Sequence, residues 1–540
     1  MTDTTSRLKT ALIVDSPSIA KWQMSALRYC LDRLEIDSVL FCTNSVVGKR
    51  IFRHGLYYLL NLFSIQNQQT KPVNWADVVD DPTKIVKFEC LTSGAWQKID
   101  NETREYISKQ KFDLIIKFGM NLLRDPQGLE TKYGVLSFHH GDPRSFRGRP
   151  SGFYELLSNC DEISVVVQQL SNRLDGGTIY SFGSYRMHRH SYRRTLEYVF
   201  EQGAILLRRA IDNCQIENPL NLLPTGTNYK LPSNLLVVEF IFRLAIRKIK
   251  RLGFGLFFRK RWRIASIENL RVDQFSKDTE VKFVNEPATP NGLSFVADPH
   301  ILPSGKIVCE ATQDRSIDGF LVLLGPTGYE PIDTSLLGRP RHLSFPFTFE
   351  ENGKLYLLPE MASYGSQSLC ELNDKFVVVK THRLVGLEDE RLIDPVLFRK
   401  DECWYLFAGR KGTENDHLFL WTSSTLFERF TPHPMNPIVI SPRRARNAGA
   451  LIEIGGGLFR MGQNNCHDYG DGITISRVIR LDPDAFEESP IGTLLVGEGH
   501  GPHTFSTANN RTVIDYYETV VDPLAWWGRA KSTLKRRSNQ

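Results

Sequence analysis

The sequence lacks the cysteine patterns that define zinc ribbons and disulfide-stapled domains. Its nine cysteines are scattered singly along 540 residues, and no two are spaced as Cys-x-x-Cys. An odd number of isolated thiols argues against a disulfide framework and is typical of a reducing compartment. We therefore expect neither a cysteine-bound metal nor structural disulfides.

Long apolar runs are also missing. The N-terminal stretch MTDTTSRLKTALIVDS has neither the apolar core nor the cleavage site of a signal peptide. The most apolar later stretch, LLVVEFIFRLAI (235–246), is interrupted by Glu239 and Arg243. It is shorter than the roughly 20 residues that a membrane-crossing helix needs. These absences predict a cytoplasmic protein.

Acidic residues are missing from one segment in particular. Between Phe240 and Ala265 there are nine basic residues and no acid, although the net charge of the whole chain is only +6. Such a segment can lie on an anionic membrane surface or a polyanionic partner, or it can be a linker helix with solvated charges. Both interpretations stay open, and the first predicts a protein held peripherally at a membrane through residues 240–265.

The composition that is present, with 41% apolar and 24% charged residues, is that of a globular protein of two to four domains. Residues 1–215 alternate short apolar runs with helical patterns, which predicts a parallel α/β sheet. A long amphipathic helix is expected over 194–214. The expected strands are KTALIVDS (9–16), DSVLFCT (37–43), KIVKFEC (84–90), FDLIIKFG (112–119), VLSFHH (135–140) and EISVVVQQL (162–170).

From residue 285 to 520 the helical patterns nearly vanish, and short strands alternate with turns, including an Asn-Gly hairpin in TFEENGKLYLLPE (348–360). A weak repeat is anchored on Asp298, Pro346, Asp394, Gly449 and Pro502, at spacings of 48, 48, 55 and 53 residues. A period of about 50 in an all-β region predicts a five-bladed propeller, with a pair of packed sheets as the alternative. Residues 216–284 are expected to form a basic, partly helical linker, and 521–540 a basic tail.

Chemistry-bearing residues gather at the end of one predicted strand. VLSFHHGDPRSFRG (135–148) holds Ser137, His139, His140 and Asp142, and Asp175 follows in LDGGTIY. Ligands of α/β sheets bind at the carboxyl ends of strands, and a histidine with a carboxylate can transfer protons or form a buried ion pair. Neighbouring side chains on a strand face opposite ways, so we do not expect a metal site here.

Three segments resemble the folate-dependent formyltransferase domain over about residues 8–215. They are KFDLIIKFGMNLL (111–123), GVLSFHHGDPRSFRGRPSGFYELL (134–157) and VVVQQLSNRLDGGTIY (165–180). His139 matches the family histidine, Arg147 and Gly148 its Arg-Gly, and Asp175 with Gly177 its Asp-x-Gly. Ser137 departs from the family, which has asparagine at that position.

The resemblance implies a Rossmann-like α/β domain that transfers a formyl group from 10-formyltetrahydrofolate to a primary amine. His139, Asp175 and Ser137 would then be catalytic. The residues implied in binding the formyl donor are Lys117, Phe118, Gly119, Met120, Asn121, Arg147 and Gly148.

FVADPHI (295–301) and LIDPVLF (392–398) resemble the strand starts of arabinanase-type five-bladed propellers. The region is also similar to the propeller attached to glucosamine inositolphosphorylceramide transferases. Both resemblances imply a carbohydrate site, for which we favour sugar or sugar-phosphate binding over hydrolysis. Its expected residues are Asp298, Glu360, Asp394, Arg446, Asn447 and His503.

Together the two halves predict formyl transfer to an amino sugar, nucleotide- or lipid-linked, in glycan or glycolipid biosynthesis. No nucleic-acid partner is expected, because a propeller stands where tRNA-formylating enzymes carry a small basic barrel. Two alternatives remain: an inactive transferase domain that supports a glycan-binding propeller, and a glycosidase or glycosyltransferase site within the propeller.

Overall fold

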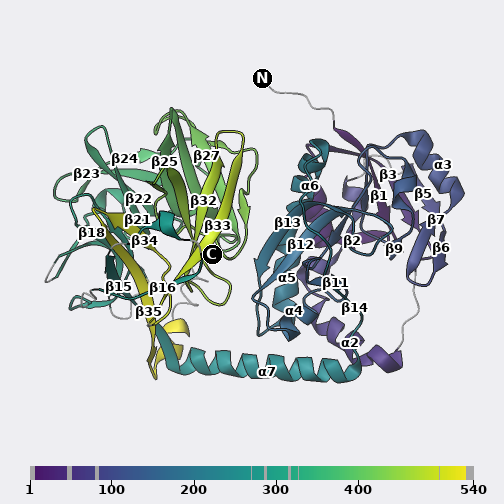
Figure 1. The fold of residues 1–540 in the computed structure, drawn as a ribbon, viewed down its shortest axis with the longest axis horizontal. Helices are drawn as coiled ribbons and strands as arrows, with labels where there is room; N and C mark the ends of the chain where they lie inside the picture. The colour runs from purple at the N-terminus through teal and green to yellow at the C-terminus, as the bar shows by residue number, and fades with distance from the viewer. Residues whose placement is uncertain are drawn as a thin grey trace. The chain divides into compact units, whose positions relative to one another are not determined.

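A computed structural model describes residues 7–45, 51–78, 84–268, 270–275, 277–284, 289–313, 318–325, 328–497 and 499–530. It divides into two compact units, 1–249 and 250–540 (Figure 1). Half of the basic tail expected at 521–540, residues 531–540, lies outside the described residues.

The first unit is built on a seven-stranded sheet. Its strands, in spatial order, are β13 (Thr178–Arg186), β12 (Glu162–Gln169), β10 (Val135–His139), β8 (Leu114–Lys117), β1 (Leu8–Val14), β3 (Leu34–Cys42) and β5 (Ile85–Phe88). All six predicted strands are present. The sheet is mixed rather than fully parallel, because β12 pairs antiparallel with both β10 and β13. The loop 170–177 between β12 and β13 is too short for a parallel crossover, and β13 was missed by the sequence pattern.

Helices and short strands complete the first unit. The helices are α1 (Lys21–Arg28), α2 (Ile51–Ser64), α3 (Asn101–Gln110), α4 (Phe153–Leu157), α5 (Tyr192–Gly203) and α6 (Leu206–Gln215). The short strands are β2 (Ser18–Ala20), β4 (Pro72–Asn74), β6 (Cys90–Ser93), β7 (Trp96–Ile99), β9 (Leu122–Leu123), β11 (Phe146–Gly148) and β14 (Thr227–Tyr229). The single helix expected over 194–214 is two helices, and the break follows Gly203, a residue type that weakens helix interiors.

The expected linker at 216–284 is only partly a linker. Helix α7 (Asn234–Phe257) is followed by β15 (Phe258–Glu268), which pairs antiparallel with β35 (Arg511–Val521), and by β16 (Thr279–Val281), which pairs with β33 (Phe486–Val496). In β15, Trp262 and Ile264 are buried while Arg261 and Arg263, the basic residues on either side of Trp262, are partly exposed. This alternation is a strand pattern, which the high positive charge obscured.

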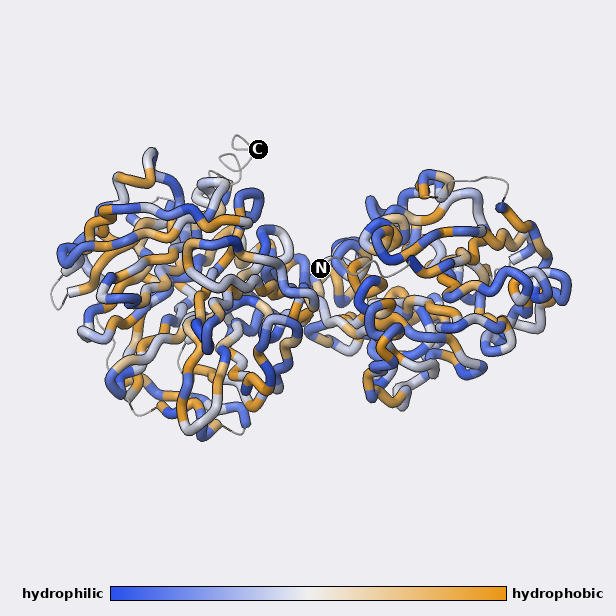
Figure 2. Tube along the Cα trace, turned by 90° about the horizontal axis from the view of Figure 1, so that it is seen from above, coloured by the Kyte–Doolittle hydropathy of each residue, from blue (hydrophilic) through white to orange (hydrophobic). Residues whose placement is uncertain are grey.

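The described part of the second unit forms five sheets. The first contains β17 (Leu293–Ile301), β18 (Ile307–Gln313), β19 (Phe320–Leu324) and β20 (Tyr329–Pro331), and the second β21 (Ser344–Glu351), β22 (Lys354–Glu360), β23 (Ser368–Leu372) and β24 (Val378–Arg383). The third contains β25 (Leu392–Lys400), β26 (Cys403–Arg410), β27 (His417–Ser423), β28 (Thr431–Pro432) and β29 (Val439–Ile440). The fourth contains β30 (Ile452–Ile454), β31 (Gly457–Gln463), β32 (Ile473–Leu481), β33 and β16, and the fifth β34 (Phe505–Ala508), β35 and β15. Figure 2 shows hydrophobic and hydrophilic residues alternating along many of these strands.

Each anchor of the sequence repeat falls within or just before an edge strand of a different sheet, which we call the start of that sheet. Asp298, Pro346 and Asp394 lie within β17, β21 and β25, and Gly449 and Pro502 lie just before β30 and β34. Asp298, Phe345 (the neighbour of Pro346) and Asp394 have φ angles of 52°, 43° and 46°, and each sits where the pairing of its strand is interrupted. Gly449 and Gly501 (the neighbour of Pro502) have φ angles of 143° and 130°. Positive φ is uncommon for residues other than glycine, so this shared kink is a repeated structural device.

Hydrogen bonds link the beginnings of these sheets. The Asp298 amide donates to Asp515 of β35 at 2.9 Å, and the Phe345 amide donates to the Asp298 carboxylate at 3.1 Å. The Asn447 side chain donates to the Asp394 carbonyl at 2.8 Å. The Phe505 amide donates to the Ala448 carbonyl at 2.6 Å. The predicted hairpin is confirmed: β21 and β22 pair around Asn352-Gly353, both with positive φ.

Candidate functional sites

In the first unit, His139 and Asp175 come together at the carboxyl end of β10. The His139 Nδ1 atom lies 3.4 Å from Asp175 Oδ1, and both side chains are largely buried. The His139 Nε2 atom lies 3.0 Å from the Phe146 carbonyl oxygen. Because a carbonyl only accepts, Nε2 carries a proton, and Nδ1 can hold a second one toward the carboxylate. The arrangement therefore suits an imidazole that donates from both nitrogens.

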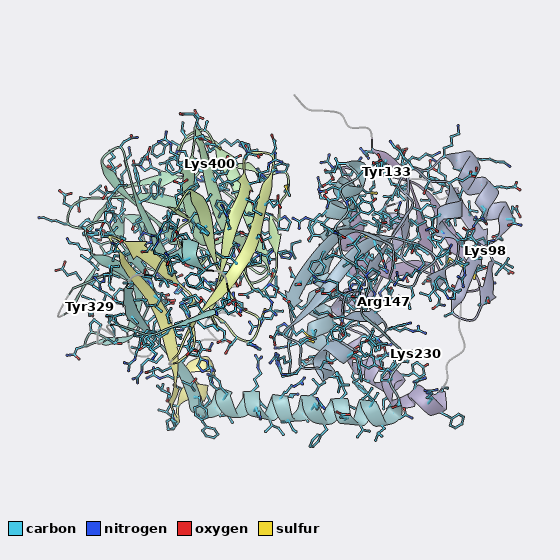
Figure 3. The ribbon with its side chains drawn as sticks, in the orientation of Figure 1. Lys98, Tyr133, Arg147, Lys230, Tyr329 and Lys400 are labelled. Carbon is cyan, nitrogen blue, oxygen red and sulfur yellow. The ribbon has the colours of Figure 1, made fainter. Side chains whose placement is uncertain are left out.

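The Arg-Gly pair fixes Asp175 in place. The Gly148 amide donates to Asp175 Oδ2 at 2.7 Å, and the Arg147 guanidinium donates to the Leu174 carbonyl. Arg147, labelled in Figure 3, belongs to β11. A side chain at Gly148 would collide with the Tyr229 carbonyl, since an added Cβ would lie 2.2 Å from it. Asp175 itself has a φ of 45°, so its backbone conformation depends on these contacts.

Ser137 and the end of β8 are joined to each other. The Ser137 hydroxyl donates to the Lys117 carbonyl at 3.4 Å, and the Lys117 ammonium donates to the Met120 carbonyl at 3.3 Å. Burial lowers the pKa of Lys117 to about 8, although nearby Asp15 opposes this shift. Gly119 is required where it stands, because an added Cβ would lie 2.4 Å from the Asp15 amide nitrogen. The Asn121 amide donates to the Gln97 side chain at 2.7 Å.

His140 and Asp142 are engaged elsewhere. The His140 ring packs edge-on against Trp22 and Phe200, and burial, helped by His139, lowers its pKa to about 3. Asp142 is paired with Arg144 at 2.7 Å. A small cavity of about 10 Å³ lies between His139, Arg147 and neighbouring residues, which is room for about one water molecule.

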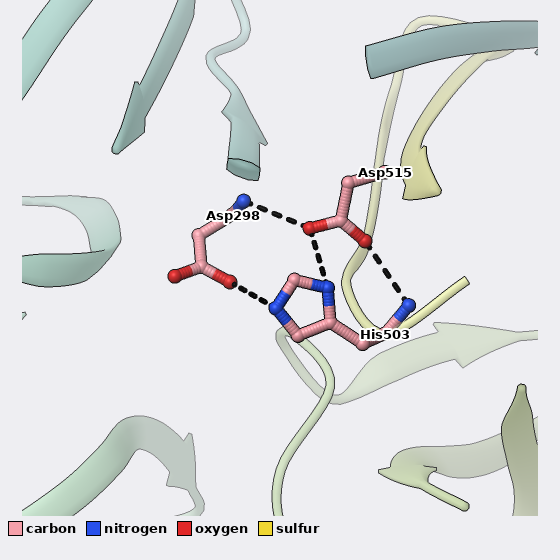
Figure 4. Close-up of side chains that lie close together, drawn as sticks. All are labelled: Asp298, His503 and Asp515. Carbon is pink, nitrogen blue, oxygen red and sulfur yellow. Dashed lines mark hydrogen bonds and ion pairs between the residues drawn. The ribbon is translucent and has the colours of Figure 1, made fainter. Parts of the chain in front are cut away.

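In the second unit, His503 lies between two buried carboxylates (Figure 4). Its Nε2 atom is 3.1 Å from Asp298 Oδ1, and its Nδ1 atom is 2.7 Å from Asp515 Oδ2. Although burial opposes the charged ring, the Asp515 and Asp298 carboxylates raise the pKa of His503 to about 10. Potential ligand atoms of these three residues lie within 4.8 Å of one another. Since each ring nitrogen faces a carboxylate, we interpret the group as a charged ion-pair triad.

A second cluster surrounds Asp394. The Arg446 Nε atom donates to Asp394 Oδ2 at 2.6 Å, and Gln463 donates to the same oxygen at 2.9 Å. The Arg446 Nη2 atom lies 3.9 Å from Glu360. Burial and the Asp394 carboxylate raise the pKa of Glu360 well above its usual range, against the influence of Arg446. Glu360 therefore favours its neutral, protonated form.

The two clusters border one cavity of about 220 Å³. Its lining residues are Trp262, Phe295, Ala297, Asp298, Glu310, His342, Ser344, Glu360, Arg446, Tyr469 and His503. Aromatic rings with charged groups are the usual lining of a site for a polar ligand. Four of the six residues predicted from the sequence line this cavity. The other two do not line it, but Asp394 accepts a hydrogen bond from the lining residue Arg446, and Asn447 donates to the Asp394 carbonyl. Sequence reasoning missed Asp515, Glu310, Trp262 and Tyr469, which carry no motif.

The comparisons with known proteins match the second half of the chain to one family. Residues 329–514 match the model described as glucosamine inositolphosphorylceramide transferase 1, N-terminal. The transferase of that name from Arabidopsis thaliana is 26% identical over 236 residues, which are 40% of this chain and 30% of the relative. The one from Oryza sativa subsp. japonica is 33% identical over 156 residues, 28% of this chain and 21% of the relative. The chain thus spans less than a third of the length of these curated relatives.

Solved structures give weaker likenesses. An N-formyltransferase from Helicobacter canadensis, solved with folinic acid and dTDP-3-aminofucose, aligns at 12% identity and a TM-score of 0.28, over 41% of this chain and 70% of that one. An α-L-arabinanase from Cellvibrio cellulosa, solved with arabinohexaose, aligns at 14% identity and a TM-score of 0.30, over 40% and 88%. These scores are too low to assign either fold. The expected similarity of the second half to the inositolphosphorylceramide transferases is borne out by the family match.

Proposed function

We propose that this chain transfers a formyl group from 10-formyltetrahydrofolate to the primary amine of an amino sugar, and that the cavity of the second unit binds the sugar. The observation that carries the proposal is the His139–Asp175 pair at the end of β10, with Asp175 fixed by the Gly148 amide. We infer further that the five sheets are the blades of a propeller. The hydrogen bonds between successive sheet starts, and the pairing of β15 with β35, support a closed ring.

In this reaction the amine nitrogen attacks the formyl carbon, the bond from that carbon to the folate nitrogen breaks, and the folate nitrogen takes up a proton. The donor molecule supplies an activated formyl group. His139 would hold a proton toward the developing oxyanion, once its Nε2 atom is released from the Phe146 carbonyl. Asp175 would keep the imidazole oriented and accept the proton that the amine loses. The Ser137 hydroxyl, bonded to Lys117, is assigned a positioning role.

The end of β8, from Lys117 to Asn121, is the segment that would hold the formyl donor. Its amides from Phe118 to Asn121 already donate to Ile13, Asp15 and Gln97, so the donor would contact its carbonyl groups. Gly119 lets two strand ends approach closely. The segment from Gly141 to Gly148 would have to open to admit the reacting groups, because the cavity beside His139 is only about 10 Å³.

The test begins with calorimetric titration of the purified chain with a stable analogue of 10-formyltetrahydrofolate, followed by transfer assays on a panel of nucleotide-linked amino sugars. We expect micromolar binding, and a 10²–10⁴-fold loss of transfer in His139→Ala and in Asp175→Asn, the range for a lost acid–base group. Asp142→Asn is the matched control, since Asp142 pairs with Arg144 instead. Absence of binding at millimolar analogue would overturn the proposal.

A second candidate is an inactive transferase domain that supports a glycan-binding unit. The specific observation in its favour is that the Nε2 proton of His139 is already donated to the Phe146 carbonyl, and the cavity beside it is nearly filled. In that case, His139→Ala would leave glycan binding unchanged and there would be no transfer to lose. Hydrolysis in the second unit is less favoured, because Asp298 and Asp394 are both already held by cationic side chains. If the chain hydrolyses a glycan and Asp394→Asn abolishes that activity, hydrolysis would become the favoured function of the second unit.

A further inference from the structure

Helix α2 exposes a regular apolar stripe. Leu56, Leu59 and Phe63 follow one another at steps of three and four residues, which places them on one face of the helix. Phe52 lies before a kink at His54, whose φ is −128°. All four side chains are exposed, and Phe52 is fully so. The buried residues after the kink lie on the other side of the helix. The helix therefore packs on the first unit through one side and exposes its apolar stripe on the other.

Helix α7 repeats this arrangement over a longer span. Val237 and Phe240 are buried against the first unit, where Phe240 stacks on Phe153 with ring centroids 4.2 Å apart. Arg247 donates on the same side to the Leu156 carbonyl. The exposed apolar residues recur at alternating steps of three and four, which places them on the other side of the helix. They are Leu235, Val238, Phe242, Ala245, Ile249, Leu252 and Leu256, with Ile241 and Ile246 beside them.

Within the first unit, two side chains join the beginning of α7 to α2. Asn234, at the start of α7, donates to the Phe52 carbonyl and accepts from the Leu56 amide, both at 3.0 Å. The His54 ring adds a 2.8 Å contact to the Pro232 carbonyl. Figure 1 shows α2 next to the beginning of α7. We name the exposed stripes of α2 and α7 together the apolar stripe.

A third exposed apolar group lies beside the end of α7 in the second unit. Val521, Leu524, Trp526 and Trp527 are all exposed. The Asp522 amide donates to the Phe257 carbonyl at 2.8 Å, so this segment is bonded to the last residue of α7. Paired tryptophans that are exposed to solvent are uncommon in water and are enriched at membrane–water interfaces.

The charges that flank the stripe are mainly basic. With 3.6 residues per turn, Arg243 and Lys250 fall along one border of the α7 stripe and Lys248 along the other. The described part of α7 has a single acid, Glu239, which is paired with Arg243 at 2.6 Å. Long basic side chains that border an apolar face can reach anionic headgroups while the face itself enters the acyl boundary.

We propose that the apolar stripe and its basic borders dock on the surface of an anionic lipid bilayer, with α2 and α7 lying in the plane of the interface. A second copy of the chain is the less favoured occupant, because packing two such helices would bring basic borders together. The stripe is also wider than a two-position coiled-coil seam, since Ile241 and Ile246 extend it. Among the residues that the structure describes, no helix is long and apolar enough to cross the bilayer. The proposal is independent of formyl transfer.

Flotation of the full chain with vesicles tests this. We expect it to float with vesicles of phosphatidylcholine containing about 30% phosphatidylglycerol, and to stay behind with pure phosphatidylcholine. Phe52→Ser/Leu59→Ser and Phe242→Ser/Ile249→Ser should each reduce the bound fraction at least tenfold. Leu91→Ser and Ile479→Ser are matched controls that remove exposed apolar side chains elsewhere, and they should not change it. Lys248→Gln/Lys250→Gln should lower the fraction of chain bound to anionic vesicles and make that fraction less sensitive to salt concentration.

Three outcomes would overturn the proposal. The first is no flotation with anionic vesicles, and the second is equal flotation with neutral ones. The third is a concentration-dependent dimer, measured by analytical ultracentrifugation, that the stripe variants but not the control variants convert to monomer. Because every substituted side chain is exposed, unchanged circular dichroism and unfolding temperature should accompany all of these variants.

Discussion

At the scale of single residues, His503 is an ionisable group of the second unit that is held on both sides by carboxylates. Its charge is held by Asp515 and Asp298, and these carboxylates also accept backbone amides of His503, Thr504 and Phe345. The charged ring is therefore part of the fold as well as of the cavity lining. The opposing charges make the stability of this unit depend on pH.

The pKa of His503 is raised from about 6.5 to about 10 in the folded state. A raised pKa means that the stabilisation is fully present below pH 6.5 and is lost as the pH rises toward 10. We expect the free energy of unfolding of the second unit to fall by on the order of a few kcal/mol across this window. Urea unfolding between about pH 6 and about pH 10 measures it, and Asp515→Asn should lower stability at the acidic end and flatten the slope. A slope that Asp515→Asn leaves unchanged would contradict this assignment.

The candidate-site residues that the sequence singled out stand in recognisable surroundings. His139 and Asp175 were found through a motif, and Asp298 and Asp394 through their repeated Asp-Pro context. Asp515 was missed because it lies inside the apolar strand RTVIDYYETV, where nothing distinguishes a charged core residue from a surface one. The contact between the Phe146 carbonyl and His139 depends on the path of the 141–148 loop, which local sequence does not determine.

At the scale of elements, α7 shows how one helix divides between a packed and an exposed face. Phe240→Ala should destabilise the first unit by about 3–5 kcal/mol, because it removes a buried ring that stacks on Phe153. Phe242→Ala, two residues along and exposed, should cost no more than about 0.5 kcal/mol. Chemical denaturation of the two variants compares them directly. Equal losses would mean that α7 is not packed through Phe240.

The hydrophobic pattern of the sequence predicted the strands of the first unit more accurately than its helices. All six predicted strands are present, because short and continuously buried runs such as LIIK in β8 are typical of strands covered on both faces. The single helix expected over 194–214 is instead divided into α5, which ends at Gly203, and α6, which begins at Leu206. β15 escaped detection because its alternating basic residues were interpreted as a charged segment rather than as the outer face of a strand.

At the scale of the whole chain, the second unit is completed by strands that come before and after its other sheets. β15 pairs along its length with β35, although some 240 residues of chain separate them. Without β15, β35 would present a long unpaired edge, which favours aggregation. The domain boundary expected at residue 285 therefore differs from the structural one, which lies within α7.

Truncation tests this closure. A chain of residues 258–530, which keeps β15, should be soluble and unfold cooperatively, as should its longer control 250–530. A chain of residues 269–530 should aggregate or unfold at a temperature lower by at least several degrees. Size-exclusion chromatography and thermal unfolding measure the difference. Identical behaviour of the three chains would show that β15 is dispensable for the unit.

The kink at the start of each sheet in the second unit requires a positive φ angle, but it does not require a particular side chain. Aspartate, phenylalanine and glycine all occupy it in this chain, with φ angles from 43° to 143°. A scaffold of this kind is regular in its main chain and irregular in its chemistry. Two of the five positions contribute carboxylates to the cavity region, so an asymmetric ligand could be matched by changing one repeat while its neighbours keep their shape.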